Sequence, residues 1–247
     1  MLVDSKLRRH VQRLSSDGAF HSHSGVIAHS DILGQDDGFA IRTTRNLVFT
    51  AWRPTLTDYI FTMKRGAQII YPKDLGTIAL AANLAPGLRV LESGVGSGAL
   101  SLVTLNTIQQ SGTLFGYELR QDFANRARAN VEGWFGPTPN YQIEIRNIYD
   151  GIDLEDIDRV LLDLPEPWQA MPHIATALVP GGMLVSYLPT INQTATLREH
   201  LVHQPFSEIR SFEVLQRGWH IEGQSVRPDH RMVAHTGFLT VARRTAG

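Results

Sequence analysis

A glycine-rich segment from Glu92 to Gly98 reads Glu-Ser-Gly-Val-Gly-Ser-Gly and joins an apolar run, Leu88 to Leu91, to apolar residues at helical spacing. This order is typical of a strand, a tight turn and the start of a helix. Glycine has no Cβ, so the backbone there can approach a ligand closely and adopt positive φ. The helix that follows would present free N–H groups and the positive end of its dipole to the same crevice. We therefore expect a ligand at this turn.

Two interpretations of the segment remain open on its spacing alone. With Ala99 as the last small residue, it fits the dinucleotide pattern G-x-G-x-x-G/A, and Glu118 lies about 20 residues further on, where an acid that binds ribose is expected. With Glu92 included, it fits E-x-G-x-G-x-G, which is typical of methyltransferases that use S-adenosylmethionine (SAM). The glycines do not distinguish a nicotinamide-dependent oxidoreductase from a methyltransferase.

Polar side chains fall at the ends of four predicted strands: Glu92, Glu118, Asn147 and Asp163. In an open α/β sheet, ligands bind beyond the carboxyl ends of the strands. We therefore expect Glu118 to take the two ribose hydroxyls of a cofactor and Asn147 to read the edge of its adenine.

The fourth of these strands runs into the turn Asp163-Leu164-Pro165-Glu166-Pro167-Trp168. Two prolines make the turn rigid and remove backbone donors from it. An acid and an aromatic residue on such a turn could accept a hydrogen bond from the exocyclic amine of a base and pack against the base's face. We therefore predict that Asp163 and Trp168 contact a nucleobase.

The elements that must position these residues follow from periodicity and turn signals. Residues 1–54 are predicted to form a small β-rich domain, with strands at about 25–28, 38–42 and 47–52. Residues 55–247 are predicted to form a second domain, which opens with two helices; Thr55 and Asp58 stand in capping-box positions at the start of the first. Strand and helix patterns then alternate to the end of the chain, which predicts a doubly wound α/β sheet. The predicted strands are 88–91, 113–118, 141–145, 158–163, 183–188, 209–216 and 236–243, and the predicted helices are 56–63, 72–84, 100–108, 122–134, 170–178 and 190–203.

The composition excludes several kinds of site and of protein. The chain has 247 residues, is 43% hydrophobic and has no cysteine, which excludes disulfides, thiolate metal sites and thiol nucleophiles. No apolar run approaches the ~20 residues that a membrane span needs, and no signal peptide is apparent, so we expect a cytoplasmic protein without a membrane partner. His21, His23 and His29 lack a carboxylate partner, so we expect no metal site.

Charge is unevenly distributed although the net charge is only −1. Residues 1–75 carry 10 basic and 7 acidic residues, residues 76–197 carry 6 and 12, and residues 198–247 carry 7 and 5. The basic ends could meet a polyanion while the acidic middle holds another ligand.

Several further segments resemble one enzyme family, and the resemblance covers nearly the whole chain up to Arg244. The glycine segment with Glu118 is similar to class I SAM-dependent methyltransferases. The other segments resemble the tRNA adenine-N1 methyltransferases that make 1-methyladenosine in the T-loop: residues 53–59 (RPTLTDY), 63–74 (MKRGAQIIYPKD), 163–168 (DLPEPW) and 219–239 (WHIEGQSVRPDHRMVAHTGFL).

The resemblance implies a fold, a cofactor and a set of cofactor contacts. The fold would be a doubly wound class I SAM-methyltransferase sheet with a small N-terminal β domain, and the cofactor would be SAM. Cofactor contacts would fall on Glu92, Gly94, Gly96, Ser97, Gly98, Glu118, Asn147 and Asp163. Asn147 departs from the family, which has an acid there: an asparagine can still accept from the adenine amine, but as a neutral group.

The resemblance also implies catalytic residues and partners. The catalytic carboxylate would be Asp163, with Tyr71 and Tyr187 holding the target base. Such enzymes are homotetramers that act on tRNA, and the RNA contacts would come from Lys64, Arg65, Lys73, Trp168, Arg217, His220, Arg227, His230 and Arg231. A non-catalytic tRNA-binding subunit with the same fold remains an alternative, although the intact glycine segment and Asp163 argue against it.

Overall fold

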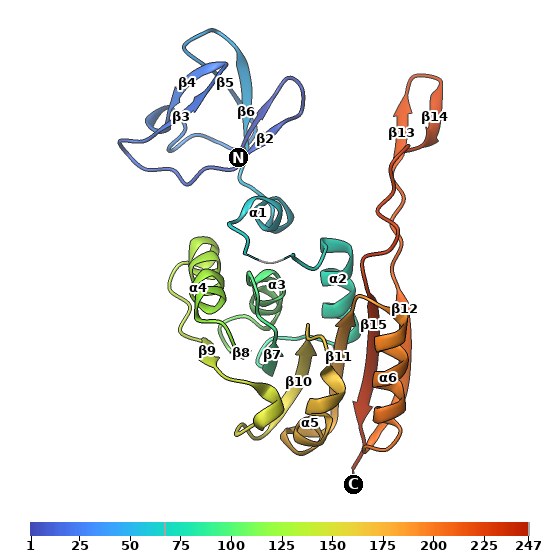
Figure 1. The fold of residues 1–247 in the computed structure, drawn as a ribbon. Coiled ribbons are helices and arrows are strands. Elements are labelled where there is room, and N and C mark those ends of the chain that lie inside the picture. The colour runs from blue at the N-terminus through green and yellow to red at the C-terminus, as the bar shows by residue number, and fades with distance from the viewer. Residues whose placement is uncertain (67, 247) are drawn as a thin grey trace. The chain divides into compact units, whose positions relative to one another are not determined.

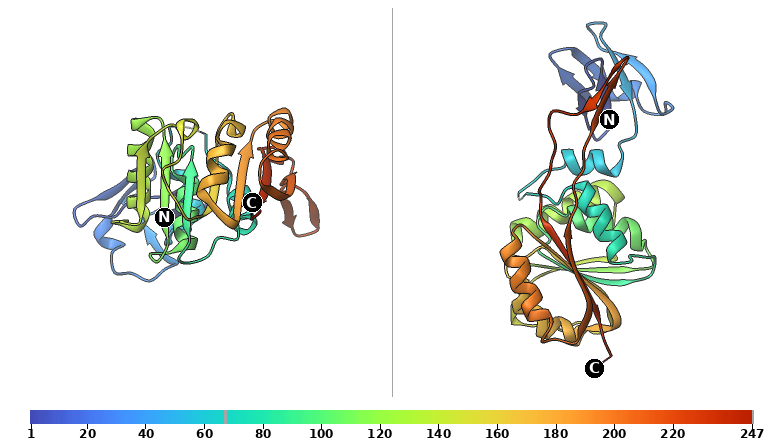
Figure 2. Two further views of the ribbon diagram at one scale, coloured as in Figure 1. Left: turned by 90° about the horizontal axis from the view of Figure 1, so that it is seen from below. Right: turned by 90° about the vertical axis from the view of Figure 1, so that its right-hand side faces the viewer.

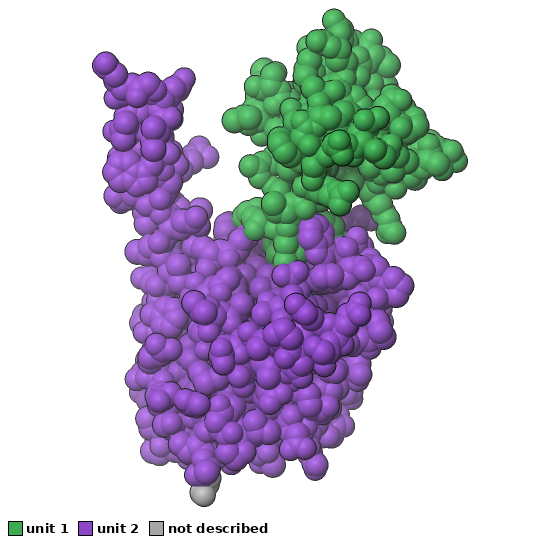
Figure 3. All heavy atoms as spheres, turned by 180° about the vertical axis from the view of Figure 1, so that it is seen from behind, with its two compact units in different colours: residues 1–63 green, residues 64–247 purple. Residues whose placement is uncertain are grey.

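The computed structural model describes residues 1–66 and 68–246, and the chain divides into two compact units, residues 1–63 and 64–247 (Figure 3). We predicted a division after Pro54, whereas the first unit continues through helix α1 (Leu56–Thr62) to Met63. The reason is a long-range contact within the unit: Asp58 of α1 forms an ion pair with Arg9. Because Asp58 is almost fully buried, this pair ties the helix to the β-rich segment before it.

The first unit contains a four-stranded antiparallel sheet and a separate hairpin. The sheet has the order β2-β1-β6-β5, and β3 pairs with β4. Its strands are β1 (Leu2–Asp4), β2 (Arg9–His10), β3 (Ala19–Ser22), β4 (Gly25–Ala28), β5 (Phe39–Arg42) and β6 (Val48–Ala51), with a short 3₁₀ turn η1 (His29–Asp31). The predicted strands correspond to β4, β5 and β6. The other three are only two to four residues long, so periodicity did not reveal them.

Helix α1 begins with the capping box expected from the sequence. The Asp58 backbone N–H donates to Thr55 Oγ1 at 3.1 Å, and the Thr55 N–H donates to Asp58 Oδ2 at 3.0 Å. Two N–H groups that a helix start leaves unpaired are thereby satisfied.

The second unit is a seven-stranded mixed sheet in the order β12-β15-β11-β10-β7-β8-β9. The five strands from β7 to β11 pair in parallel, and β15 runs antiparallel between β11 and β12. Its strands are β7 (Arg89–Ser93), β8 (Thr113–Glu118), β9 (Tyr141–Ile145), β10 (Ile157–Leu162), β11 (Leu178–Leu188), β12 (Phe206–Glu213) and β15 (Phe238–Arg244). The strands β13 (Trp219–Glu222) and β14 (Ser225–Pro228) pair only with each other.

Helices cover both faces of this sheet, as Figures 1 and 2 show. They are α2 (Pro72–Ala81), α3 (Ala99–Ile108), α4 (Gln121–Phe135), α5 (Met171–Ala177) and α6 (Ile191–Leu201), with 3₁₀ turns η2 (Ile148–Asp150) and η3 (Pro167–Ala170). The doubly wound α/β sheet predicted from the alternating patterns is therefore confirmed. Among the described helices, none combines the length and apolar character that crossing a bilayer requires.

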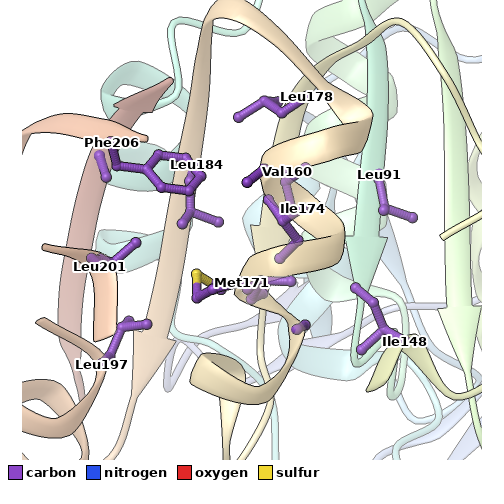
Figure 4. Close-up of a cluster of buried hydrophobic side chains, with 14 of the residues drawn as sticks. Leu91, Ile148, Val160, Met171, Ile174, Leu178, Leu184, Leu197, Leu201 and Phe206 are labelled. Atoms are coloured by element: carbon purple, nitrogen blue, oxygen red, sulfur yellow. The ribbon is translucent and has the colours of Figure 1, made fainter. Parts of the chain in front are cut away.

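The core of the second unit lies between β10, β11 and the helices α5 and α6 (Figure 4). Val160 and Leu162 of β10 are buried there together with Ile174 of α5 and Leu197 of α6. The run Val160 to Leu162 is buried throughout, as expected for a central parallel strand covered on both faces. This packing fixes β10 and therefore fixes the residue that follows it, Asp163.

The strand order reverses between β7 and β10, since the chain moves outward from β7 to β8 and β9 and then returns to β10. At such a switch point the loops after the two strands separate and leave a crevice for a ligand. The glycine segment follows β7 and Asp163 follows β10, so both lie at this crevice.

An arm between β12 and β15 was not predicted. We expected strands to continue to Gln216 and to resume at Thr236, whereas β12 ends at Glu213 and β15 begins at Phe238. Residues 214–237 instead extend beyond the sheet and end in the hairpin β13–β14 (Figure 1). One face of the hairpin is apolar and exposed: Trp219 is 57% exposed, Ile221 71% and Val226 61%. Residues 219–222 and 225–228 alternate between apolar and polar side chains, but each strand has only four residues, so the signal is weak.

Candidate functional site

The loop after β7 can form only with glycine at position 94. Gly94 has φ +86°, and a Cβ built there would overlap the backbone carbonyl oxygen of Asp163 and lie 2.8 Å from its carbonyl carbon. The ends of β7 and β10 therefore approach too closely for any side chain. Gly98 has φ +82° and precedes α3, and a Cβ there would lie 3.2 Å from Ala127 Cα of α4.

Glu118, the last residue of β8, is fixed against the glycine loop. Its Oε2 accepts from the Gly96 N–H at 3.0 Å and its Oε1 accepts from the Arg120 N–H at 3.0 Å. The carboxylate is only 8% exposed. Two backbone donors thus hold one acid in place at the crevice, where the sequence predicted a carboxylate for ribose.

A cavity of about 320 Å³ opens at this point. Its walls include five of the residues predicted for the cofactor: Gly94, Gly96, Glu118, Asn147 and Asp163. Ser93 also lines it but was not predicted, and the predicted contacts Glu92, Ser97 and Gly98 do not line it. Asn147 caps η2, since its Oδ1 accepts from the Tyr149 N–H at 3.2 Å. The sequence did not single out the other lining residues, which are Gln68, Tyr117, Leu119, Arg120, Phe123, Arg146, Ile148, Tyr149, Leu164 and Pro165.

One of these missed residues, Phe123, lies in the first turn of α4. The Arg120 guanidinium is 3.7 Å from the centre of its ring. Its position five residues after Glu118 places it beside the crevice, and this was the one signal that could have identified it.

Two buried acids of the crevice have strongly raised pKa values. Burial, with repulsion from Glu118, raises the pKa of Asp163 to about 7. Burial also raises the pKa of Glu92 to about 8, against a smaller opposing effect of Ser101 and with added repulsion from Asp163 and Glu118. Repulsion from Glu118 thus adds to the effect of burial on both Asp163 and Glu92, and a bound cation would relieve that repulsion.

The carboxyl groups of this site fit SAM, whose sulfonium and amino groups are cationic. Glu92 is fully buried, and among the described residues no hydrogen bond of normal geometry reaches either of its carboxylate oxygens. A buried acceptor without a partner is costly, but Glu92 lies behind the cavity wall with Ser101 beside it, so a cofactor contact through Glu92 remains a prediction. The glycine backbone supplies the close approach and Glu118 the acceptor for a diol. Nothing in this arrangement requires a pyrophosphate.

One of the two predicted tyrosines, Tyr187, lies near Asp163 and near the other, Tyr71. Burial raises the pKa of Tyr187, on β11, to about 12, and the neighbouring charges of Asp74 and Asp163 and the Tyr71 side chain raise it further. The phenol is therefore neutral at physiological pH and can donate a hydrogen bond. Tyr71 immediately precedes α2 as its N-cap residue. Tyr187 therefore interacts with both Asp163 and Tyr71, and the catalytic roles of the three residues remain predictions.

Ser97 holds the loop before α2 rather than lining the cavity. Its Oγ accepts from the Gly66 N–H at 3.1 Å. Asn130 of α4 donates to the Ser97 carbonyl and to the Lys64 carbonyl, both at 2.9 Å. Asn130 was not identified from the sequence, because nothing local marks a helix residue that joins two distant loops. A cofactor contact through Ser97 remains a prediction.

The predicted RNA contacts lie in three settings. Lys64 and Arg65 are exposed at the start of the second unit. Trp168 packs against the hydrophobic core and lies 6.2 Å, between ring centres, from His200 of α6, so it is not a wall of the cavity. Lys73 is enclosed: its Nζ lies 2.8 Å from Asp74 Oδ1 and its side chain is only 6% exposed.

The remaining predicted RNA contacts are on the arm. His220 and Arg227 are paired residues of β13 and β14, so they share one face of the hairpin, opposite the apolar face. His230, Arg231 and Arg217 are exposed near the base of the hairpin. Across residues 1–66 and 68–246, no group of three or more histidines and acids has the geometry of a metal site.

Comparisons with known proteins agree with this geometry. Residues 51–226 match the family described as tRNA methyltransferase complex GCD14 subunit, and residues 1–41 match the TrmI-like N-terminal family. The chain is 36% identical over 246 residues to the tRNA (adenine(58)-N(1))-methyltransferase TrmI of Thermus thermophilus, covering 99% of this chain and 96% of that protein. It is 31% identical to the tRNA (adenine(57)-N(1)/adenine(58)-N(1))-methyltransferase TrmI of Methanocaldococcus jannaschii, covering 98% and 94%.

Solved structures give the same result. A SAM-dependent O-methyltransferase of Thermotoga maritima superposes with a TM-score of 0.93 at 34% identity, covering 100% of this chain and 92% of that one. The tRNA (m1A58) methyltransferase TrmI of Aquifex aeolicus superposes with a TM-score of 0.85 at 29% identity, covering 100% and 96%. With the glycine loop, the three carboxyls and the switch-point crevice in place, this chain belongs to the TrmI family of class I SAM-dependent tRNA adenine-N1 methyltransferases.

Proposed function

We propose that this chain transfers a methyl group from SAM to N1 of an adenosine in the T-loop of tRNA. The observation that carries the proposal is the position of Asp163, a carboxyl of raised pKa that follows β10 and lines the same cavity as the glycine loop and Glu118. The relatives named for adenine-N1 methylation match this chain over nearly its whole length. Family membership favours SAM over a nicotinamide cofactor.

The chemistry explains why a carboxylate belongs here. SAM supplies an electrophilic methyl group. Adenine N1 is neutral before it is methylated and cationic afterwards, so the protein must align the base and place negative charge near it rather than activate a nucleophile. Asp163 would accept from the exocyclic amine, which orients N1 and offsets the developing charge. The ionised form of Asp163 is the competent one in this scheme.

The other residues of the site would bind and orient. Glu92 and Glu118 would accept from the cofactor's amino group and ribose hydroxyls, with the glycine backbone beneath them. Asn147 would contact the adenine of the cofactor. A T-loop adenosine is stacked within the tRNA and must be turned out to reach the crevice. Tyr71 and Tyr187 would hold the extruded base.

Basic residues would bind the tRNA backbone. The exposed residues Lys64 and Arg65 and the polar face of the arm are suited to phosphate contacts, which position the RNA without reading its sequence. Because the Lys73 ammonium is enclosed and paired with Asp74, we no longer include Lys73 among these contacts. Trp168 is also a weaker candidate, since it packs against the core.

Self-association as a homotetramer is part of the proposal. It is supported by the exposed apolar face of the arm, where Trp219, Ile221 and Val226 are all more than half exposed, because such a face is unfavourable in water unless a partner covers it. Light scattering of the purified protein would give the mass of the assembly, and a monomer would exclude this part of the proposal. A cytoplasmic location, where tRNA is modified and used, is likewise proposed.

Mass spectrometry of tRNA nucleosides tests the reaction. The protein and SAM would be incubated with an unmodified tRNA transcript, and with a matched transcript carrying guanosine in place of the T-loop adenosine. We expect 1-methyladenosine from the first transcript and none from the second. The appearance of 2′-O-methyladenosine, which chromatography separates from 1-methyladenosine, would instead indicate an O-methyltransferase and contradict the proposal.

A further inference from the structure

A buried ion pair lies at the start of α2, next to Tyr71. Lys73 Nζ is 2.8 Å from Asp74 Oδ1 and 3.0 Å from Asp74 Oδ2. The exposed fractions of the two side chains are 6% and 0%. The chain has three lysines, and the other two, Lys6 and Lys64, are exposed. Removing two charges from water is costly, so a buried ion pair needs further hydrogen bonds to offset the cost of its desolvation.

Those further hydrogen bonds join the two ends of the arm. Lys73 Nζ donates to the carbonyl oxygen of Val214 and to Thr236 Oγ1, both at 2.6 Å. Val214 is the first residue after β12, and Thr236 lies two residues before β15. One ammonium group therefore fixes the point where the arm leaves the sheet and the point where it returns.

Thr236 connects this pair to the catalytic tyrosine. Its Oγ1 donates to Asp74 Oδ2 at 2.7 Å and accepts from Lys73. The Thr236 hydroxyl also lies beside the Tyr187 phenol and lowers its pKa, against the larger effect of burial. A hydroxyl has one proton and two acceptor lone pairs. Because Thr236 gives its proton to Asp74 and accepts from Lys73, one acceptor position of its hydroxyl is left for the neighbouring phenol of Tyr187.

Backbone packing holds the same phenol from a second direction. A Cβ built on Gly237 would overlap Cζ of Tyr187 and lie 2.7 Å from its hydroxyl oxygen. The Gly237 backbone is therefore in direct contact with the ring. Residues 236 and 237 together limit where the Tyr187 hydroxyl can lie, and Lys73 and Asp74 in turn fix residue 236.

We propose that Lys73 and Asp74, acting through Thr236, are positioning residues that hold the Tyr187 hydroxyl at the base-binding end of the crevice and couple it to the arm. This role rests on the proposed function, because Tyr187 is the residue assigned there to the target base. It also gives the arm, which carries His220 and Arg227, a direct mechanical link to the site of methyl transfer.

The Thr236→Val variant tests the link with little change of volume, and Thr236→Ser restores the hydroxyl. Thr240→Val is the matched control: Thr240 is equally a threonine of this segment and is 1% exposed, but its Oγ1 lies 2.9 Å from Ser211 Oγ and has no bond to Lys73. Single-turnover methyl transfer would be measured at saturating SAM and tRNA, with SAM affinity measured separately.

We expect Thr236→Val to slow the single-turnover rate by roughly 10- to 100-fold, the scale of a small misplacement of a reacting group. Thr236→Ser and Thr240→Val should stay within about threefold of the wild type, and SAM affinity should not change. In a Tyr187→Phe background, Thr236→Val should cost little more, because the two changes break one interaction. A wild-type rate for Thr236→Val, or fully additive losses, would overturn the proposal.

A measurement without substrate separates this proposal from the proposed function. The protein has six tyrosines, so 3-fluorotyrosine labelling gives six ¹⁹F resonances, and Tyr187→Phe identifies one of them. Thr236→Val and Lys73→Met should shift that resonance, whereas Thr236→Ser and Thr240→Val should not. An unmoved resonance overturns the positioning role even if the protein methylates tRNA. A shifted resonance in a protein that methylates no RNA would refute the proposed function alone.

Discussion

Replacing Gly94 with alanine separates the two reasons for which a glycine is present in the cofactor loop. Gly94 has φ +86°, and a Cβ there would overlap the Asp163 carbonyl. Gly181 has nearly the same conformation, φ +81°, but a Cβ there would meet nothing within 4 Å. The variant Gly181→Ala therefore measures the conformational cost alone, and Gly94→Ala measures that cost plus the steric overlap.

The expected magnitudes follow from this geometry. A left-handed conformation costs an alanine about 1–2 kcal/mol, which is the loss of unfolding free energy expected for Gly181→Ala. Overlap with backbone cannot be relieved by a rotamer change and adds about 1–3 kcal/mol. Gly94→Ala should therefore lose about 2–5 kcal/mol.

The overlap should also weaken SAM binding, because the ends of β7 and β10 must separate and both line the cavity. If SAM binds only when the two strand ends return to their wild-type positions, binding must supply the roughly 1–3 kcal/mol of the overlap. The affinity for SAM then falls by about 5- to 150-fold, at 1.4 kcal/mol for each factor of ten.

Urea denaturation would give the two stability losses, and isothermal titration calorimetry would give the SAM affinities. Gly181→Ala should bind SAM as the wild type does. If Gly94→Ala lost no more stability than Gly181→Ala and bound SAM equally well, the close approach of the two strand ends would not be what requires glycine here.

Three further predictions concern charge. Asp163→Ala should lower the single-turnover rate by roughly 10²–10³, the loss when one preorganised electrostatic partner is removed, with SAM and tRNA affinities changing far less; a wild-type rate would make Asp163 a structural acid. SAM should bind about tenfold more weakly at pH 6 than at pH 8 through Asp163 alone, because the pKa of Asp163 is raised to about 7 and a cationic ligand favours its ionised form. Calorimetry of the wild type and of Asp163→Asn at both pH values isolates this contribution. Equal pH dependence of SAM affinity in the two proteins would contradict the prediction. Arg231→Ala should reduce the slope of log affinity for tRNA against log salt by about one without altering SAM affinity, and an unchanged slope would place Arg231 away from the RNA.

The sequence by itself determined the elements whose signals are local. The glycine segment between an apolar strand and a helix, and the acids Glu118 and Asp163 at strand ends, depend on residues a few positions apart, and the structure contains each of them as predicted. Alternating patterns then limit the topology, because ligands at the carboxyl ends of parallel strands must share one crevice. The capping box of Thr55 and Asp58 is local in the same sense.

The roles of residues whose partners are distant in the sequence could be seen only in the tertiary structure. Lys73 looked like a phosphate-binding residue beside Arg65, but its partners Val214 and Thr236 lie 141 and 163 residues away. We predicted that Trp168 contacts a nucleobase because it follows a rigid turn with two prolines, yet its side chain packs against the core. The arm was missed because each of its two strands has only four residues, so their alternation of apolar and polar side chains is too short to stand out in the sequence. A side chain's role depends on its desolvation and on its neighbours, and long-range packing sets both.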